Sequence, residues 1–550
     1  MQTITIVLIL LLTVTASNFL AQMAPFKLPL PLLQIVVGFA VSYATDFDIV
    51  LNPDIFFLLF IPPLLFLDGW RIPKGALLRD HRPILMLAIG LVIFTVVCIG
   101  LLIDWLIPMM PLAVSFALAA ILSPTDPVAV SAITAKTPIP RRLMHILEGE
   151  SLLNDASGLV CFRFAVAAAL TGTFSIAQVS LQFALVAGGG VLIGALLTML
   201  IGLVNQLLIR QAGEEPGIQV ILSLLIPFAA YLAAEHLHAS GILAAATAGI
   251  TMHYADLLGR PLAATRMQRS AVWDTVQMIL NGIMFVLLGQ QLPRILNSVA
   301  KISRDAHIAS PWHLAGYVVC ITLALTVLRL AWVWASVNLT LFNKHQSSQL
   351  PPTSTVRLLG VTAFAGVKGA ITLAGILTLP LALPDGTPFP ARDLTIFLAM
   401  GVILLSLLLA SVALPMFAAG MEFSPRPAAI AKEVDVRNAA AEAAIRCIEK
   451  IRRDAAKDKT PEAKVIPEAA MRLIELYQHR LHYGQAFSNE AQHALMLADT
   501  ERHIRIEALR AERDELYRLR MAGEIDDPLH LQLVHEIDLM EAAFSRQAPH

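Results

Sequence analysis

Charged residues are scarce in this chain, and the few that it has nearly cancel. Asp, Glu, Lys and Arg make up 15% of the 550 residues, and the formal net charge is −1. No broad basic surface for nucleic acid is therefore expected, and no zinc-finger, phosphate-loop or RNA-binding pattern occurs. The four cysteines are scattered singly without a Cys-x-x-Cys pair, so they are expected to be small core residues.

Sequence signatures of hydrolytic enzymes are also missing. We find no His-Glu-x-x-His zinc motif, no Gly-x-Ser-x-Gly nucleophile turn and no Cys-His pair. The sequence therefore predicts neither an enzyme nor a bound cofactor. A zinc requirement, or covalent labelling by a serine hydrolase probe, would point instead to a membrane-embedded enzyme.

Apolar residues dominate what is present. They make up 57% of the chain, and the mean hydropathy is +0.69, which is typical of a membrane protein. About 20 helical residues cross the hydrocarbon core of a bilayer, and thirteen candidate runs precede residue 420. Their approximate spans are 3–22, 29–45, 54–70, 83–103, 112–135, 144–172, 176–207, 217–235, 239–253, 273–292, 312–340, 357–383 and 394–418. We expect an all-α polytopic membrane domain.

The basic residues predict the orientation of these spans. The first cation, Lys27, follows the first run, which favours a chain that begins outside. Fourteen Lys and Arg residues then fall in inside loops and four in outside loops, so the C-terminus is expected in the cytoplasm. The inside set is Lys27, Arg71, Lys74, Arg79, Arg82, Lys136, Arg141, Arg142, Arg210, Arg260, Arg266, Arg269, Lys344 and Arg357, and the outside set is Arg294, Lys301, Arg304 and Arg392.

The composition changes abruptly at about Glu422. Nineteen of the 40 Lys and Arg residues lie beyond it, beside many Glu, Ala and Leu residues. We expect a membrane domain over 1–420 and a cytoplasmic helical tail over 421–550, with a long helix that starts near Ser488 and a last helix that starts at Asp526-Asp527-Pro528. The tail's histidines, including His479 and His482, suit pH sensing or metal binding, although ordinary surface histidines are commoner. The simplest role for the tail is regulation or dimer stabilisation.

The stretch "ILSPTDPVAV", residues 121–130, places an acid inside an apolar run. Pro124 and Pro127 lack backbone N–H groups, so the fifth span is expected to break around Thr125 and Asp126. Irregular backbone at membrane depth persists where it is buried in protein or lines a watery cavity, and freed carbonyls there can hold small cations. The alternative is a proline kink capped by a polar pair.

The stretch "EGESLLNDASGLV", residues 148–160, adds a polar helix face to the sixth span. The spacing of its polar residues is i,i+3 and i,i+4, so they share one face that cannot point into lipid. These residues are Glu150, Ser151, Asn154 and Asp155. Carboxylate, amide and hydroxyl oxygens suit a hard monovalent cation. The alternative is a polar seam for helix packing.

The two stretches together resemble the paired signature of NhaP-type and NHE-type sodium/proton exchangers, within the monovalent cation/proton antiporter superfamily. The likeness extends through "FIPPLLFLDGW" (60–70), "SGILAAATAGI" (240–250), "NGIMFVLLGQQLP" (281–293) and "AGVKGAITLAG" (365–375), and it stops before the tail. The resemblance implies an inverted-repeat fold with broken core helices, a core bundle that moves against a dimerisation domain, and a homodimer in the bacterial inner membrane.

Residue roles also follow from the resemblance. Asp155 is implied to be the shared cation and proton site, with Asp126, Thr125, Ser151 and Asn154 as supporting ligands or organisers. The implied Na⁺ ligands are Asp155, Asp126, Thr125 and Ser151. Glu150 is implied to pair with Lys368, which stands where the family's segment carries arginine. A buried lysine can lose its proton whereas arginine stays charged, so this departure bears on stoichiometry; a conservative swap in a structural ion pair is the alternative.

Five further polar positions lie inside or near expected spans. Asp68 is a candidate accessory ligand or gate, or an interfacial cap. Arg163 is a candidate for balancing the acidic core, but snorkelling towards lipid headgroups is the commoner behaviour for both Arg163 and Arg329. Gln277 and Asn281, one turn apart in the tenth span, are expected to be polar helix-packing residues.

The function implied is secondary active exchange of Na⁺ or Li⁺ for H⁺ by alternating access, for pH and sodium homeostasis. The Asn154-Asp155 pair, in place of two aspartates, is similar to the electroneutral branch of the family. Potassium/proton exchange, or exchange of several monovalent cations, is the alternative, because oxygen ligands alone do not fix ion size. A membrane sensor that no longer transports is a third reading, which the intact Asp126 and Asp155 disfavour.

Overall fold

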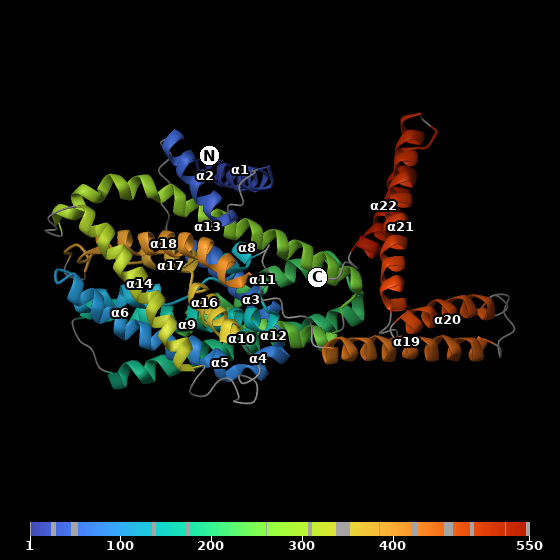
Figure 1. Ribbon diagram of the computed structural model, residues 1–550, viewed down its shortest axis with the longest axis horizontal. Helices are drawn as coiled ribbons and strands as arrows, with labels where there is room; N and C mark the ends of the chain where they lie inside the picture. Colours follow the sequence, from blue (N-terminus) through green and yellow to red (C-terminus); the bar gives the residue numbers. More distant parts are fainter. Residues whose placement is uncertain are drawn as a thin grey trace. The chain divides into compact units, whose positions relative to one another are not determined.

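The computed structural model is mainly helical in the part of the chain that it describes (Figure 1). The described residues are 2–23, 29–45, 53–134, 139–171, 176–259, 261–305, 311–336, 352–383, 386–419, 427–455, 466–483, 489–522 and 524–545. Within them the one β-type pairing is an isolated bridge between Ala382 and Pro388. The chain divides into two compact units, Met1–Glu422 and Phe423–His550.

The first unit is built from long apolar helices and several shorter ones. They are α1 (Gln2–Met23), α2 (Leu30–Thr45), α3 (Pro53–Arg71), α4 (Lys74–Arg79), α5 (His81–Leu85), the π-helix η1 (Met86–Leu91), α6 (Val92–Leu106), α7 (Leu112–Leu122), α8 (Pro127–Thr134), α9 (Arg141–Thr171), α10 (Ile176–Ala212), α11 (Pro216–His236), α12 (Gly241–Gly259), α13 (Ala263–Asp305), α14 (Pro311–Ser336), α16 (Pro352–Phe364), α17 (Ala370–Leu377) and α18 (Arg392–Ala418). Large apolar side chains such as Leu196 and Val412 are exposed, as expected of a surface that faces lipid.

Eight of the described helices are long and apolar enough to cross a membrane, or nine if the bent pair α7 and α8 counts as one span. The sequence predicted thirteen spans. Each predicted run overlaps described helix, but several helices, such as the 16-residue α2, fall short by length or composition. The protein is a multi-pass membrane protein, and the count of thirteen stays a prediction.

Two spans are interrupted where the backbone cannot continue a helix. The fifth span breaks between α7 and α8, which are bent by 43°, as Pro124 and Pro127 predicted. The twelfth breaks between α16 and α17 at residues 365–369, and this break was not predicted. Glycines at 366 and 369 are its signal in the sequence, because glycine weakens a helix interior.

Helix packing sorts the first unit into two groups. In one group, α2 packs along α13, and α12 packs along α3, α10 and α11. In the other, α7 packs along α6 and α9, while α14, α16 and α18 pack on one another. We call these the scaffold group and the core group. The two breaks belong to the core group.

The described residues of the second unit form four helices: α19 (Pro427–Ala455), α20 (Ile466–Tyr483), α21 (Asn489–Met521) and α22 (Asp527–Ser545). They form two pairs, α19 with α20 and α21 with α22. Asp526 caps α22, because its Oδ1 accepts the Leu529 N–H at 3.1 Å. Ser488 lies outside the described residues, as do the side chains of His479 and His482.

Candidate functional site

A cavity with an empty volume of about 430 Å³ lies where the two helix groups meet at the break in the fifth span. Its lining residues come from α3 and α13 on one side and from α7–α8, α9 and α17 on the other. They are Leu64, Asp68, Asn281 and Met284 on the first side, and Pro124, Thr125, Asp126, Pro127, Val128, Ser151, Asp155, Gly369, Ile371 and Thr372 on the second. Three carboxylates therefore face one space.

Asp126 is held at the point where the two broken spans cross. Its Oδ1 accepts the Val128 and Ala129 N–H groups at 2.9 and 3.1 Å, which caps the first turn of α8. Its own backbone N–H donates to the Val367 carbonyl at 2.9 Å, which ties the fifth span to the twelfth. A Cβ at Gly369 would lie 2.1 Å from Asp126 Oδ2, so this crossing requires a residue without a side chain.

Polar side chains on α9 organise Thr125 at the same break. The Ser151 hydroxyl donates to the Thr125 carbonyl at 2.7 Å, and the Asn154 Nδ2 donates to Thr125 Oγ1 at 2.9 Å. All three residues are buried. The polar face of α9 therefore closes onto the irregular backbone and holds its oxygens in place. Asn154 Oδ1 is left without a hydrogen-bond partner among the described residues.

Asp155 and Asp68 face the cavity without partners. Asp155 is 3% exposed, and neither carboxylate forms an ion pair or a hydrogen bond with a residue that the structure describes. Oxygen ligands of this kind suit a hard cation or a proton, and a buried carboxylate that forms no direct ion pair or hydrogen bond is stabilised by either one. No three His, Cys, Asp or Glu side chains in the described part of the chain form a group that could hold a metal ion.

The partner of Glu150 differs from the sequence-based expectation. Glu150 is fully buried and forms a two-pronged ion pair with Arg329 on α14, in which NH2 donates to Oε2 at 2.7 Å and NH1 donates to Oε1. The predicted pair of Glu150 with Lys368 is therefore wrong, and so is the expectation that Arg329 snorkels. Arg329 is 5% exposed, and its Nε also donates to the Thr362 carbonyl at 2.8 Å. Its planar fork matches a carboxylate in a way that an ammonium cannot.

Lys368 instead caps the broken end of α7. Its Nζ donates to the Ser123 and Pro124 carbonyls at 3.2 and 3.1 Å, two of the groups that the prolines prevent from completing a helix. A cation at the C-terminal end of a helix is stabilised by the helix dipole. A second cavity, with an empty volume of about 400 Å³, lies beside Lys368 in the core group and is lined by hydroxyls that include Thr95, Thr322 and Ser406.

Arg163 lies away from the cavity. Its guanidinium donates to Glu235 Oε1 at 3.3 Å, and the same oxygen accepts the Gly241 N–H at 3.2 Å. Arg163 is half-exposed, so it bridges α9 to the end of α11 and does not balance the acidic cavity. Of the two amides in the tenth span, Asn281 lines the cavity, whereas Gln277 accepts a hydrogen bond from Arg71 at 2.6 Å.

Comparisons with known proteins agree with this architecture. The family model of the sodium/hydrogen exchanger transmembrane region matches residues 7–420. The Na⁺/H⁺ exchanger YjcE of Escherichia coli K12, named as uncharacterized, is 40% identical over 98% of both chains. A sodium, potassium, lithium and rubidium/H⁺ antiporter of Bacillus pumilus is 38% identical over 97% of this chain and 77% of its own.

A solved structure shares the fold. The sodium proton antiporter MjNhaP1 from Methanocaldococcus jannaschii matches 76% of this chain and 99% of its own with a TM-score of 0.56. Its sequence identity of 18% limits that likeness to the fold. The family model and the more similar relatives go beyond the fold, because they match by sequence. They show that the chain belongs to the sodium/hydrogen exchanger family, whose members are membrane antiporters.

Proposed function

We propose that the protein exchanges Na⁺ or Li⁺ for H⁺ across the bacterial inner membrane, with Asp155 as the group that both ions share. The observation that carries this proposal is the cavity between the helix groups, where Asp155 has no ion-pair partner among the described residues. A carboxylate in such a place holds a proton or a cation but not both. Competition between the two ions then couples their movements.

The proposed ligand set for Na⁺ consists of Asp155, Asp126, Thr125 and Ser151, with Asn154 as an organiser and Asp68 as an accessory ligand. All except Asn154 line the cavity. Ser151 and Asn154 use their donors to hold Thr125, which leaves oxygen lone pairs directed towards other groups. The protein itself supplies every ligand in this scheme, so exchange needs no cofactor.

Alternating access is the proposed route between the two sides of the membrane. The cavity walls belong to two helix groups, so a movement of the core group against the scaffold group would carry Asp126 and Asp155 away from the α3 wall. If the site cannot change the side of the membrane that it faces while it is empty and charged, cation entry is coupled to proton exit without ATP. One proton per cation makes the exchange electroneutral. We further propose a homodimer, an outside N-terminus and a cytoplasmic tail with a regulatory role.

Exchange of K⁺, or of several monovalent cations, is the second candidate. It is favoured by the name of the Bacillus pumilus relative, which lists sodium, potassium, lithium and rubidium. Carboxylate and hydroxyl oxygens bind all of these ions. The cation order therefore has to be measured.

Proton flux in proteoliposomes tests the proposal. The purified protein is reconstituted with an internal pH-sensitive dye, a pH gradient is set, and Na⁺, Li⁺, K⁺ or choline is added in turn, with Asp155→Asn as the matched control. We expect Na⁺ or Li⁺ to dissipate the gradient in the wild type and not in the variant. Flux with K⁺ alone would establish the second candidate, and flux with no cation across the pH range would reject exchange.

A further inference from the structure

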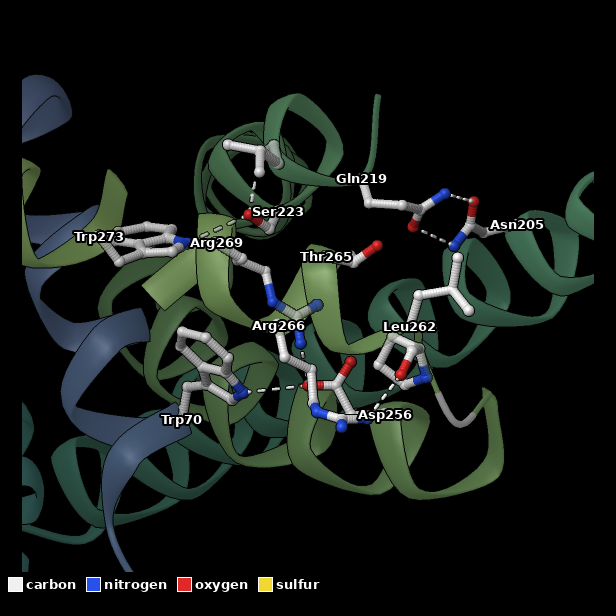
Figure 2. Close-up of polar contacts among 12 residues, drawn as sticks. Trp70, Asn205, Gln219, Ser223, Asp256, Leu262, Thr265, Arg266, Arg269 and Trp273 are labelled. Carbon is white, nitrogen blue, oxygen red and sulfur yellow. Dashed lines mark hydrogen bonds and ion pairs between the residues drawn. The ribbon is translucent and has the colours of Figure 1, made fainter. Parts of the chain in front are cut away.

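The end of α3 is fixed to the scaffold group by a compact polar cluster (Figure 2). Trp70 Nε1 donates to Asp256 Oδ2 at 3.2 Å, and Arg269 NH2 donates to the same oxygen at 2.6 Å. The Arg269 guanidinium also lies over the Trp70 ring, 4.7 Å from its centre. The three residues come from the ends of α3, α12 and α13, so the cluster joins three helices at one point.

Joining helices through such a charged cluster costs free energy of desolvation. Arg269 is 3% exposed, and its Nε has no hydrogen-bond partner in the described part of the chain. A buried ion pair gives up hydration that its attraction only partly restores, and well-packed apolar residues often stabilise as much. What apolar packing does not supply is the direction that a hydrogen-bonded guanidinium, stacked on an aromatic ring, imposes on its neighbours. The cluster is therefore better suited to setting geometry than to adding stability.

The geometry that it sets is that of the last turn of α3. Trp70 is two residues beyond Asp68, and the intervening Gly69 packs so closely on α12 that a Cβ there would lie 2.3 Å from the Ala246 carbonyl oxygen. Lys74 Nζ donates to the Gly69 and Ile72 carbonyls at 2.6 and 2.8 Å, which closes the end of the same turn. The backbone around Asp68 is thus held from its C-terminal side.

The Asp68 carboxylate has nothing else to hold it. It lines the cavity opposite Asp126 and Asp155 but makes no hydrogen bond or ion pair with a described residue. With no hydrogen bond from a described residue to fix the carboxylate, its position depends strongly on the backbone of α3. A displacement of about 1 Å at a ligand is enough to change binding strongly.

We propose that Trp70, Asp256 and Arg269 are positioning residues, which hold the last turn of α3 so that Asp68 faces the cation cavity. The inference rests on the proposed function and extends it, because it places the determinant of cation affinity in a cluster outside the cavity. Loss of a cluster member lets the turn move, and the cavity then loses one carboxylate from its wall while Asp126 and Asp155 stay in place.

The test is a double-mutant cycle with full-length protein in proteoliposomes. Asp256→Asn removes the charge at nearly constant shape, and Trp70→Phe removes the indole N–H but keeps an aromatic ring. For each variant we expect the apparent KM for the driving cation to rise about tenfold, with a change in Vmax per folded transporter of less than about twofold. Combined with Asp68→Asn, Asp256→Asn should add no further rise in KM, because both changes act through one carboxylate.

A matched control lies in the same helix group. Asn205 and Gln219 exchange two hydrogen bonds, at 2.7 and 2.9 Å, between α10 and α11, and they lie apart from Trp70 (Figure 2). Replacing both by leucine should leave KM unchanged. If Asp256→Asn and Trp70→Phe behave like this control, or if their effects add to that of Asp68→Asn, the positioning role is rejected.

Cation-dependent thermal stabilisation in detergent separates this inference from the proposed function. Wild-type protein should gain melting temperature as Na⁺, Li⁺ or K⁺ is added, and Asp256→Asn should need about tenfold more cation for the same gain. A wild type that responds to no cation in either assay overturns the proposed function and the inference with it. A wild type that responds, beside a variant with the same concentration dependence, overturns the inference alone.

Discussion

Glu150 and Asp155 lie five residues apart on α9, yet they have opposite surroundings. Both carboxylate oxygens of Glu150 accept hydrogen bonds from the Arg329 guanidinium. Asp155 faces the cavity and has no ion-pair partner among the described residues. Both are acids inside a membrane domain, so chemical type alone does not separate them. The difference teaches that the absence of a direct ion pair with a described residue, and not the type of residue, singles out Asp155 as the candidate for the transport site.

The largest effect should come from removing the unpaired acid. We expect Asp155→Asn to reduce cation-driven proton flux to the background of empty liposomes, because the amide can neither carry the proton nor neutralise the cation. The melting temperature in detergent should stay level or rise, because the change removes a buried charge that no direct ion pair with a described residue balances. Flux at wild-type level would reject the assignment of Asp155.

Removing the cation that pairs with Glu150 should instead lower the stability of the protein. Arg329→Met leaves the Glu150 carboxylate buried without a counter-ion, and such changes cost about 3–5 kcal/mol of stability. We expect a low yield of folded protein and a much lower melting temperature. The double variant Glu150→Leu with Arg329→Met should recover most of that loss, since it removes both charges. A single variant as stable as the wild type would contradict this account.

Two substitutions of Lys368 test whether its ammonium group is needed for its charge or for its shape. Lys368→Met should cost about 1–3 kcal/mol, because the Ser123 and Pro124 carbonyls lose their donor in a buried site. Lys368→Arg should retain more of the stability than Lys368→Met, because a guanidinium still offers N–H donors to the two carbonyls. Thermal unfolding of the two variants measures this difference, and equal losses would speak against the capping role.

The smallest effect should come from the half-exposed pair of Arg163 with Glu235. Arg163→Gln should cost no more than about 1 kcal/mol, because such pairs are weak in water and are screened by salt. Melting temperatures at low and high salt should converge between wild type and variant as the salt rises. A loss as large as that of Arg329→Met would show that burial is a poor guide in this molecule.

Much of the architecture follows from local sequence. Apolar runs of about 20 residues predict the long helices, and the two prolines around Thr125 and Asp126 predict the break between α7 and α8, because proline removes a donor and clashes with the preceding turn. The spacing of the polar residues on α9 places them on one face. That pattern already singles out Asp155, Ser151 and Asn154 as candidates.

The pairing of charges could not be obtained in this way. Lys368, Arg329 and Arg163 are all cations inside apolar runs, and periodicity does not distinguish them. The structure gives them three different surroundings: Lys368 at the broken end of α7, Arg329 against Glu150, and Arg163 against Glu235. Which acid a cation meets depends on how helices far apart in the chain cross.

The sequence by itself therefore determined the class of the protein, its long helices, the first break and the polar face of α9, because each of these depends on residues within a few turns of one another. Only the tertiary structure decided which carboxylates face the cavity without an ion pair, and which cation pairs with Glu150. It also decided that Trp70, Asp256 and Arg269 come together from α3, α12 and α13. These depend on long-range packing, which no local pattern encodes.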